Sequence, residues 1–169
     1  MSALRVRGRC WKVGDNIPTD AIVATANLFK PYEEMARHVL ASVHPEFVRG
    51  VKPGDVLVAG RHFACSSGRA VAPKALRATG IGVVVAESFA RTFYRNAHEV
   101  GLPILECPGI TEQVREGDEL DVDVEAGLVR NLTLGQTIQA VPPPPFLRGM
   151  LKAGGLHAYL ELHGGEFVS

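Results

Sequence analysis

The sequence has few cysteines, no excess of either charge and no long apolar run. Its three cysteines, Cys10, Cys65 and Cys107, are odd in number and far apart, which fits neither a disulfide framework nor the close cysteine pairs of a zinc site. Lysine plus arginine and aspartate plus glutamate number 18 each. The chain therefore lacks the net positive charge typical of proteins that bind phosphate backbones. We expect free thiols, no metal ion held by this chain alone, and no nucleic acid partner.

Membrane and secretory signals are also missing. No apolar run approaches the length of a membrane span, and the N-terminus lacks the apolar segment of a signal peptide. We expect a cytoplasmic protein that does not bind membranes. The chain has 169 residues, of which 46% are hydrophobic, so it can bury a core and is expected to form a single domain over residues 1–169.

The middle of the chain alternates between strand and helix patterns. The apolar run 55–60 and the β-branched run 81–87 are typical of strands buried in a sheet. Residues 70–80 and 88–101 show helical spacing, and 102–107 is a further short apolar run. Strand, helix and strand in this order predict an α/β core built from right-handed βαβ units.

The C-terminal third changes from this pattern to an antiparallel one. Residues 119–124 and 127–134 alternate around a short turn, which predicts a hairpin, and 136–141 can add another strand. The four prolines at 142–145 predict a stiff extended connector, because proline cannot continue a ladder of hydrogen bonds. Residues 146–165 then predict a terminal helix, which Gly154 and Gly155 break.

The loop "RHFACSSGR" at 61–69 lies between a strand and a helix, where anions bind in α/β proteins. Ser66, Ser67 and Gly68 are small enough to let a carboxylate or phosphate approach the backbone. Arg69 could hold a carboxylate through two parallel hydrogen bonds. The composition alone is equally compatible with serines that only cap the helix and an arginine in solvent.

Cys65, His62 and His98 also lie near this chemistry. A helix N-terminus can activate a thiol, but small buried cysteines are common, and a structural role is the favoured interpretation of Cys65. His62 and His98 are interpreted as surface or capping residues rather than catalytic bases.

Three stretches, 14–28, 60–105 and 117–138, resemble in order and spacing the small subunit of 3-isopropylmalate dehydratase, the swivel-domain relative of aconitase. The sequence "ESFARTFYRNA" followed by "GLPIL" is specific to this group. The resemblance implies a β/β/α swivel domain that closes over a larger partner, in a heterodimer or heterotetramer. It also implies that the large subunit holds a 4Fe-4S cluster through its own cysteines, and that this chain binds no cofactor itself.

The activity that this resemblance implies is that of a hydro-lyase, which isomerises a hydroxy dicarboxylic acid by dehydration and rehydration. A substituted malate is the expected substrate, with 3-isopropylmalate, an intermediate of leucine biosynthesis, as the first candidate. Homoaconitate, citraconate-related acids and dimethylmalate are alternatives in the same class. A swivel domain that only binds a partner or a carboxylate is the alternative from another class.

Aligned on the family's loop pattern, Ser67 takes the position of the serine that removes the carbon-bound proton, and Arg69 that of the carboxylate clamp. Ser66 and Gly68 are carried over as substrate-binding neighbours. The chain departs from the pattern at the residues that replace two glycines, the second serine, a glutamate and a histidine, which are Ala64, Ser66, Gly68, Ala70 and Val71. These departures put one hydroxyl contact to the substrate in doubt.

A second departure lies in the segment that helps the family select the substrate's side group, where this chain has Asn27, Leu28, Phe29 and Lys30. Leu28 and Phe29 favour an alkyl side group, whereas Lys30 could serve a carboxylate. The preceding Asp15, Asn16, Thr19 and Asp20 match the family well and are interpreted mainly as a structural turn.

Overall fold

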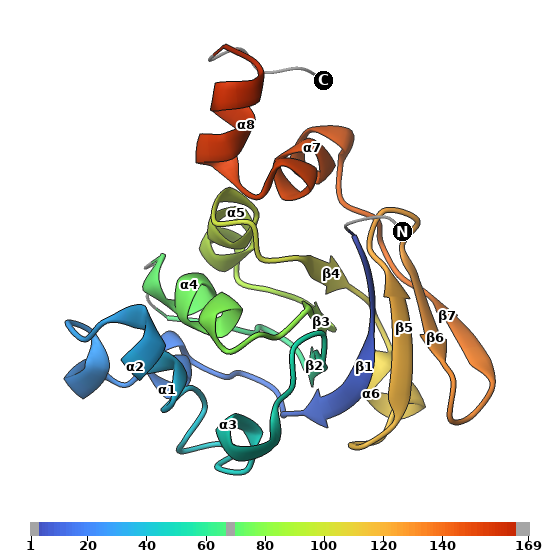
Figure 1. The fold of residues 1–169 in the computed structure, drawn as a ribbon. Helices are drawn as coiled ribbons and strands as arrows, with labels where there is room; N and C mark the ends of the chain where they lie inside the picture. The colour runs from blue at the N-terminus through green and yellow to red at the C-terminus, as the bar shows by residue number, and fades with distance from the viewer. Residues whose placement is uncertain (1–3, 67–69, 165–169) are drawn as a thin grey trace.

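The computed structural model describes residues 4–66 and 70–164. Seven strands form one curled sheet in the order β4-β3-β2-β1-β5-β6-β7 (Figure 1). The strands are β1 Arg5–Lys12, β2 Val56–Ala59, β3 Val83–Ala86, β4 Ile104–Glu106, β5 Glu119–Asp123, β6 Leu128–Asn131 and β7 Gln136–Gln139. The helices are α1 Thr19–Ile22, the 3-10 helix η1 Thr25–Asn27, α2 Tyr32–Ala36, α3 Phe47–Gly50, α4 Val71–Ala78, α5 Arg91–Glu99, α6 Ile110–Gln113, α7 Pro145–Ala153 and α8 Leu156–Leu162. No helix in the described ranges is long and apolar enough to cross a membrane.

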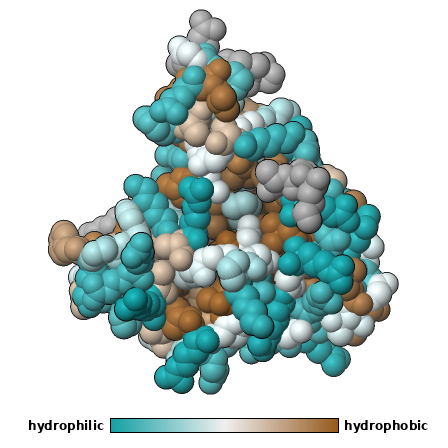
Figure 2. Space-filling view, in the orientation of Figure 1, coloured by the Kyte–Doolittle hydropathy of each residue, from teal (hydrophilic) through white to brown (hydrophobic). Residues whose placement is uncertain are grey.

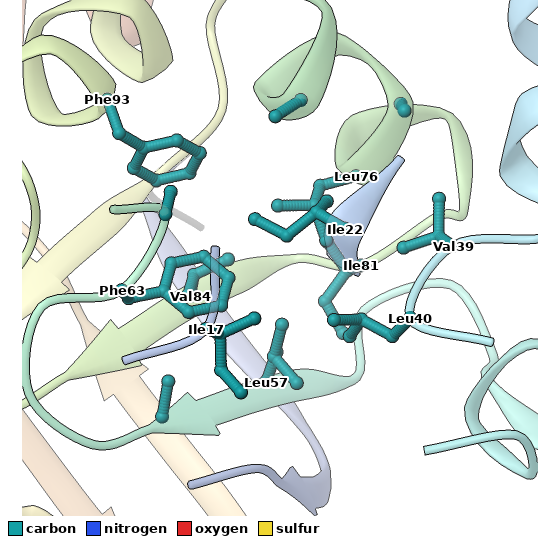
Figure 3. Close-up of a cluster of buried hydrophobic side chains, with 14 of the residues drawn as sticks. Ile17, Ile22, Val39, Leu40, Leu57, Phe63, Leu76, Ile81, Val84 and Phe93 are labelled. Atoms are coloured by element: carbon teal, nitrogen blue, oxygen red, sulfur yellow. The ribbon is translucent and has the colours of Figure 1, made fainter. Parts of the chain in front are cut away.

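The parallel half of the sheet consists of β1 to β4, and α4 and α5 are the crossovers between its last three strands. The strands are buried on both sides because their side chains alternate between two apolar clusters. Leu57 and Val84 pack against the helices (Figure 3), whereas Val56 and Val83 pack against the antiparallel strands. Helices, parallel strands and antiparallel strands thus form successive layers, and the predicted α/β core is present.

Strand β1 joins the two halves of the sheet. It pairs in parallel with β2 through Cys10–Lys12 and in antiparallel with β5 through Arg5–Arg9. Sequence analysis assigned no strand here, because arginine occupies every second position of its first half. In the structure Arg5 pairs with Asp121 at 2.9 Å and Arg7 with Glu119 at 3.0 Å, so that cross-strand partners supply the charge pairing that the isolated segment lacks.

The C-terminal region follows its predicted pattern. Strands β5, β6 and β7 form an antiparallel meander, and the expected terminal helix is divided into α7 and α8. Gly154 and Gly155 form the break with φ angles of +98° and +129°, which only glycine adopts easily. A Cβ on Gly155 would lie 2.6 Å from the Glu99 carbonyl oxygen, so the break packs tightly on the end of α5. Helix α7 begins at Pro145, one residue inside the predicted connector.

Asp55 connects β1 to the start of β2 from a buried position. Its Oδ1 accepts a hydrogen bond from the Arg9 backbone N–H at 3.1 Å. Its Oδ2 accepts one from Trp11 Nε1–H and one from the Lys52 N–H, both at 2.9 Å. Three donors from two segments of the chain therefore share one carboxylate.

Replacing Asp55 with alanine should lower the free energy of unfolding by about 3 kcal/mol, because buried donors would lose a charged acceptor. Urea denaturation measures the change. Glu119→Ala is the matched control, since its exposed ion pair with Arg7 should contribute less than about 1 kcal/mol. Equal losses in the two variants would contradict the role given to Asp55.

Candidate active site

The segment that follows β1, which we call the entrance segment (residues 15–19), pairs with the loop that follows β2. The backbone N–H of Asn16 donates to the carbonyl of Arg61 at 2.8 Å, and that of Thr19 donates to the carbonyl of Cys65 at 3.0 Å. These residues were interpreted from the sequence as a structural turn. Their backbone groups also hold the predicted catalytic loop from one side.

Gly60 allows the closest approach between the two segments. A Cβ at this position would lie 1.8 Å from Asp15 Oδ1, a distance that no side chain can occupy. The same Oδ1 accepts a hydrogen bond from the Arg61 N–H at 2.8 Å. The absence of a side chain at Gly60 therefore lets the Asp15 carboxylate fix the start of the loop.

Every second residue of the loop from His62 to Ser66 has a backbone in the left-handed conformation. His62, Ala64 and Ser66 have φ angles of +55°, +62° and +84°. Ala64 and Ser66 stand where the family pattern has glycine, the residue that adopts such angles without strain. For other residues the left-handed conformation costs about 1–2 kcal/mol, so the loop holds strain at the approach to Ser67.

Ser66→Gly should remove this strain and leave the free energy of unfolding equal to or above that of the unmodified chain, even though glycine loses more entropy on folding. Ser66→Val should lower it by about 1–2 kcal/mol, because a β-branched residue is disfavoured at a positive φ. Thermal and urea denaturation of both variants provide the comparison. A glycine variant less stable than the valine variant would rule out strain at this position.

A pocket of about 210 Å³ lies where the entrance segment, α1, η1 and the loop meet. The described residues that line it are Thr19, Asp20, Val23, Thr25, Leu28, Ser66 and Val71. It brings together Ser66 and Leu28, two residues carried over as substrate contacts. Thr19 and Asp20 were not assigned to the site from the sequence, because nothing local distinguishes a turn from a pocket wall.

Thr19 supplies a hydroxyl to the pocket wall next to the loop. Its Oγ1 donates to the carbonyl oxygen of Cys65 at 3.0 Å and lies 3.5 Å from Ser66 Oγ. Thr19 is buried, and its hydrogen bond to the Cys65 carbonyl fixes the backbone two residues before Ser67 in the sequence.

The other predicted substrate contacts are arranged less uniformly. Asn27 is half-buried, whereas Phe29 is 99% exposed and does not line the pocket. Lys30 Nζ lies 3.8 Å from Glu34 Oε1, so its charge has a partner one helical turn away. Ser67, Gly68 and Arg69 lie outside the described residues.

Glu87 directly follows β3 and connects the end of this strand to the start of α6. Its carboxylate accepts hydrogen bonds from the Gly109 N–H at 2.5 Å, the Thr111 N–H at 2.9 Å and the Thr111 hydroxyl at 2.8 Å. Burial acts to raise the pKa of Glu87, but these donors and the nearby charge of Arg61 outweigh it and hold the pKa below its ordinary value. Sequence analysis interpreted Glu87 only as the end of a strand.

Because the pKa of Glu87 is lower in the folded protein, its ionised form stabilises the fold above its ordinary pKa of 4.5, and this stabilisation is lost as the pH falls through the lowered value. Glu87→Gln should therefore show a smaller drop in melting temperature between pH 7 and about pH 3.5. Glu112→Gln is the control, because Glu112 is exposed and lines the same surface cavity as Glu87. An unchanged acid response in Glu87→Gln would contradict this account.

Cys10, Cys107 and His98 are poorly suited to ligate a metal ion. Cys10 and Cys107 are buried, and burial raises their pKa values to about 12 and about 11, which keeps both thiols protonated. His98 is fully buried and its Nδ1–H donates to the Tyr94 carbonyl at 2.7 Å, so its interpretation as a surface or capping residue was wrong. Burial lowers the pKa of His98. Within residues 4–66 and 70–164, no group of three His, Cys, Asp or Glu side chains could hold a metal ion.

Residues 22–108 match the model of the aconitase C-terminal domain, which covers half of the chain. Together with the layered sheet and the loop at its edge, this match defines the chain as an aconitase-type swivel domain. The isopropylmalate/citramalate isomerase small subunit of Methanocaldococcus jannaschii is 49% identical to it, over 92% of this chain and 94% of the relative. The 3-isopropylmalate dehydratase small subunit of Aquifex aeolicus is 47% identical, over 94% and 95% of the two chains.

A crystal structure of 3-isopropylmalate dehydratase from Methanocaldococcus jannaschii superimposes with a TM-score of 0.90 at 37% identity and covers 95% of each chain. The chain belongs to the family of 3-isopropylmalate dehydratase small subunits. The family resemblance identified from its sequence is confirmed.

Proposed function

We propose that this chain is the small subunit of a hydro-lyase that isomerises a substituted malate, with 3-isopropylmalate of leucine biosynthesis as the first candidate. The observation that supports the proposal is the pocket lined by Ser66, the residue that precedes Ser67 in the sequence, because this pocket combines hydroxyl groups with apolar contacts. The names of the relatives support the same class of reaction. A pocket of this composition suits a small acid that has both polar groups and an alkyl group.

Ser67 is proposed to remove the carbon-bound proton and Arg69 to bind a substrate carboxylate. A free serine hydroxyl is too weak an acid to serve as a base near neutral pH, so its alkoxide needs stabilising groups. Arg69 and the backbone N–H groups at the start of α4 are the candidates in this chain. The entrance segment fixes the backbone of the loop up to Cys65, two residues before Ser67 in the sequence.

The large subunit is the proposed partner, in a heterodimer or heterotetramer, and it is proposed to hold a 4Fe-4S cluster. Such a cluster supplies a Lewis-acidic iron to the substrate hydroxyl when it is bound. The buried, protonated thiols of Cys10 and Cys107 do not fit the cluster, so this chain is assigned only the proton-transfer and carboxylate-binding groups. The cytoplasmic location expected from the sequence remains part of this proposal.

Two contacts favour an alkyl side group on the substrate. Leu28 lines the pocket beside Ser66, where it can contact a small apolar group. Lys30 is paired with Glu34, which makes it less available to a substrate carboxylate. An alkyl malate therefore fits the segment 27–30 better than a homoaconitate-type substrate with a carboxylate side group.

Ser67→Ala should lower kcat of the reconstituted two-subunit enzyme by about 10²–10⁴-fold, because a positioned proton-transfer group contributes that much. Arg69→Lys should also raise KM, since an ammonium group cannot reproduce the paired hydrogen bonds of a guanidinium. Cys65→Ser is the control and should retain activity. If Cys65→Ser abolished turnover while Ser67→Ala did not, the proton-transfer residue would be misassigned.

A panel of isopropylmalate, dimethylmalate, citramalate and homocitrate tests the substrate class with the same enzyme. Leu28→Ala should lower kcat/KM for the preferred alkyl substrate. The loss should correspond to about 1–3 kcal/mol of transition-state binding energy, the usual range for an apolar pocket contact. Phe29→Ala is the matched comparison for a neighbouring side chain outside the pocket. Homocitrate preference that is lost in Lys30→Ala would overturn the alkyl assignment, and no turnover of any acid would favour the non-catalytic alternative.

A further inference from the structure

A groove of about 800 Å³ lies on the helical layer, between α4 and α8. Helix α8 stands away from the sheet, and apolar side chains reach the surface of the lobe it forms (Figures 1 and 2). The groove has a cationic wall on α4, made by Lys74 and Arg77. Its apolar wall is made by Val100 and Leu156.

Lys74 and Arg77, the two cations of the groove, have no carboxylate partner in the part of the chain that the structure describes. Lys74 Nζ lies 5.7 Å from the centroid of the Tyr32 ring, and Arg77 Nη1 donates to the Val100 carbonyl at 2.7 Å. Neither forms an ion pair within residues 4–66 and 70–164. Among the described residues that line the groove, Glu99 carries the only negative charge. A partner with carboxylates along one side would complement this surface.

The groove adjoins the candidate active site at the start of α4, where Ala70 lines the groove and the next residue, Val71, lines the pocket. It begins at Ala70, directly after the proposed catalytic residues, and Tyr32 on its wall follows the proposed specificity segment 27–30. A large subunit that completes the site beside Val71 would therefore lie next to the groove. This proximity favours the large subunit as the partner, which the charges alone leave open.

We propose that the large subunit docks an acidic, partly apolar segment in the groove between α4 and α8. Its carboxylates face Lys74 and Arg77, and its apolar side chains pack against Val100 and Leu156. The inference rests on the proposed function, because it names the binding surface of the partner that this function requires.

The test measures the affinity of the large subunit for this chain by titration calorimetry. Ala158→Trp fills the groove from α8, and Lys74→Glu reverses a charge on its α4 wall. Glu161→Trp is the matched control on α8, and Arg49→Glu is the matched charge reversal on α3; neither residue lines the groove. Circular dichroism melts verify that each variant is folded.

Both groove variants should weaken binding by about tenfold or more, and the controls should stay within about twofold. The loss in Lys74→Glu should shrink as salt is raised, because salt screens the charge pairing. Groove variants that bind like the unmodified chain in an active pair would overturn the inference and leave the proposed function intact. Self-association of this chain alone, abolished by Ala158→Trp, would show that a second copy occupies the groove instead. Absence of both binding and turnover with the unmodified chain would overturn the proposed function as well.

Discussion

The pairing between the entrance segment and the loop after β2 is the constraint on which the site depends. Backbone hydrogen bonds join Asn16 to Arg61 and Thr19 to Cys65, and the missing side chain of Gly60 lets Asp15 close the start of the loop. Without this pairing the left-handed residues of the loop would have no partner to offset their strain. The pocket exists because the pairing brings α1 and η1 against the loop.

Sequence patterns predicted the elements whose signal is local. The βαβ units and the hairpin follow from apolar runs and turn residues that lie side by side along the chain. Strand β1 was missed because its arginines find their partners on β5, far away in the sequence. The pocket role of Thr19 was missed for the same reason, since its contact with Cys65 depends on the entrance pairing. The burial of His98 was missed because it depends on segments that pack against α5, and the residues of α5 alone do not reveal them.

The loop differs from the family pattern in its residues while its backbone takes conformations that suit glycine. Its replacements at Ala64 and Ser66 keep the backbone conformation that glycine would adopt, so the geometry survives with strain added. The segment 27–30 differs from the family pattern in its side chains. Leu28 lines the pocket and Phe29 is exposed, which is consistent with our proposal that this chain supplies only part of the binding site. A partner that covers this edge of the sheet would complete it.

The central claim is that this chain holds half of a dehydratase site. The most direct measurement follows the ultraviolet absorbance of the unsaturated acid formed from 3-isopropylmalate. It compares the metal-stripped chain alone, the cluster-loaded large subunit alone and their mixture. The account predicts turnover only in the mixture, rising with this chain until the large subunit is saturated. Robust turnover by this chain alone would contradict it.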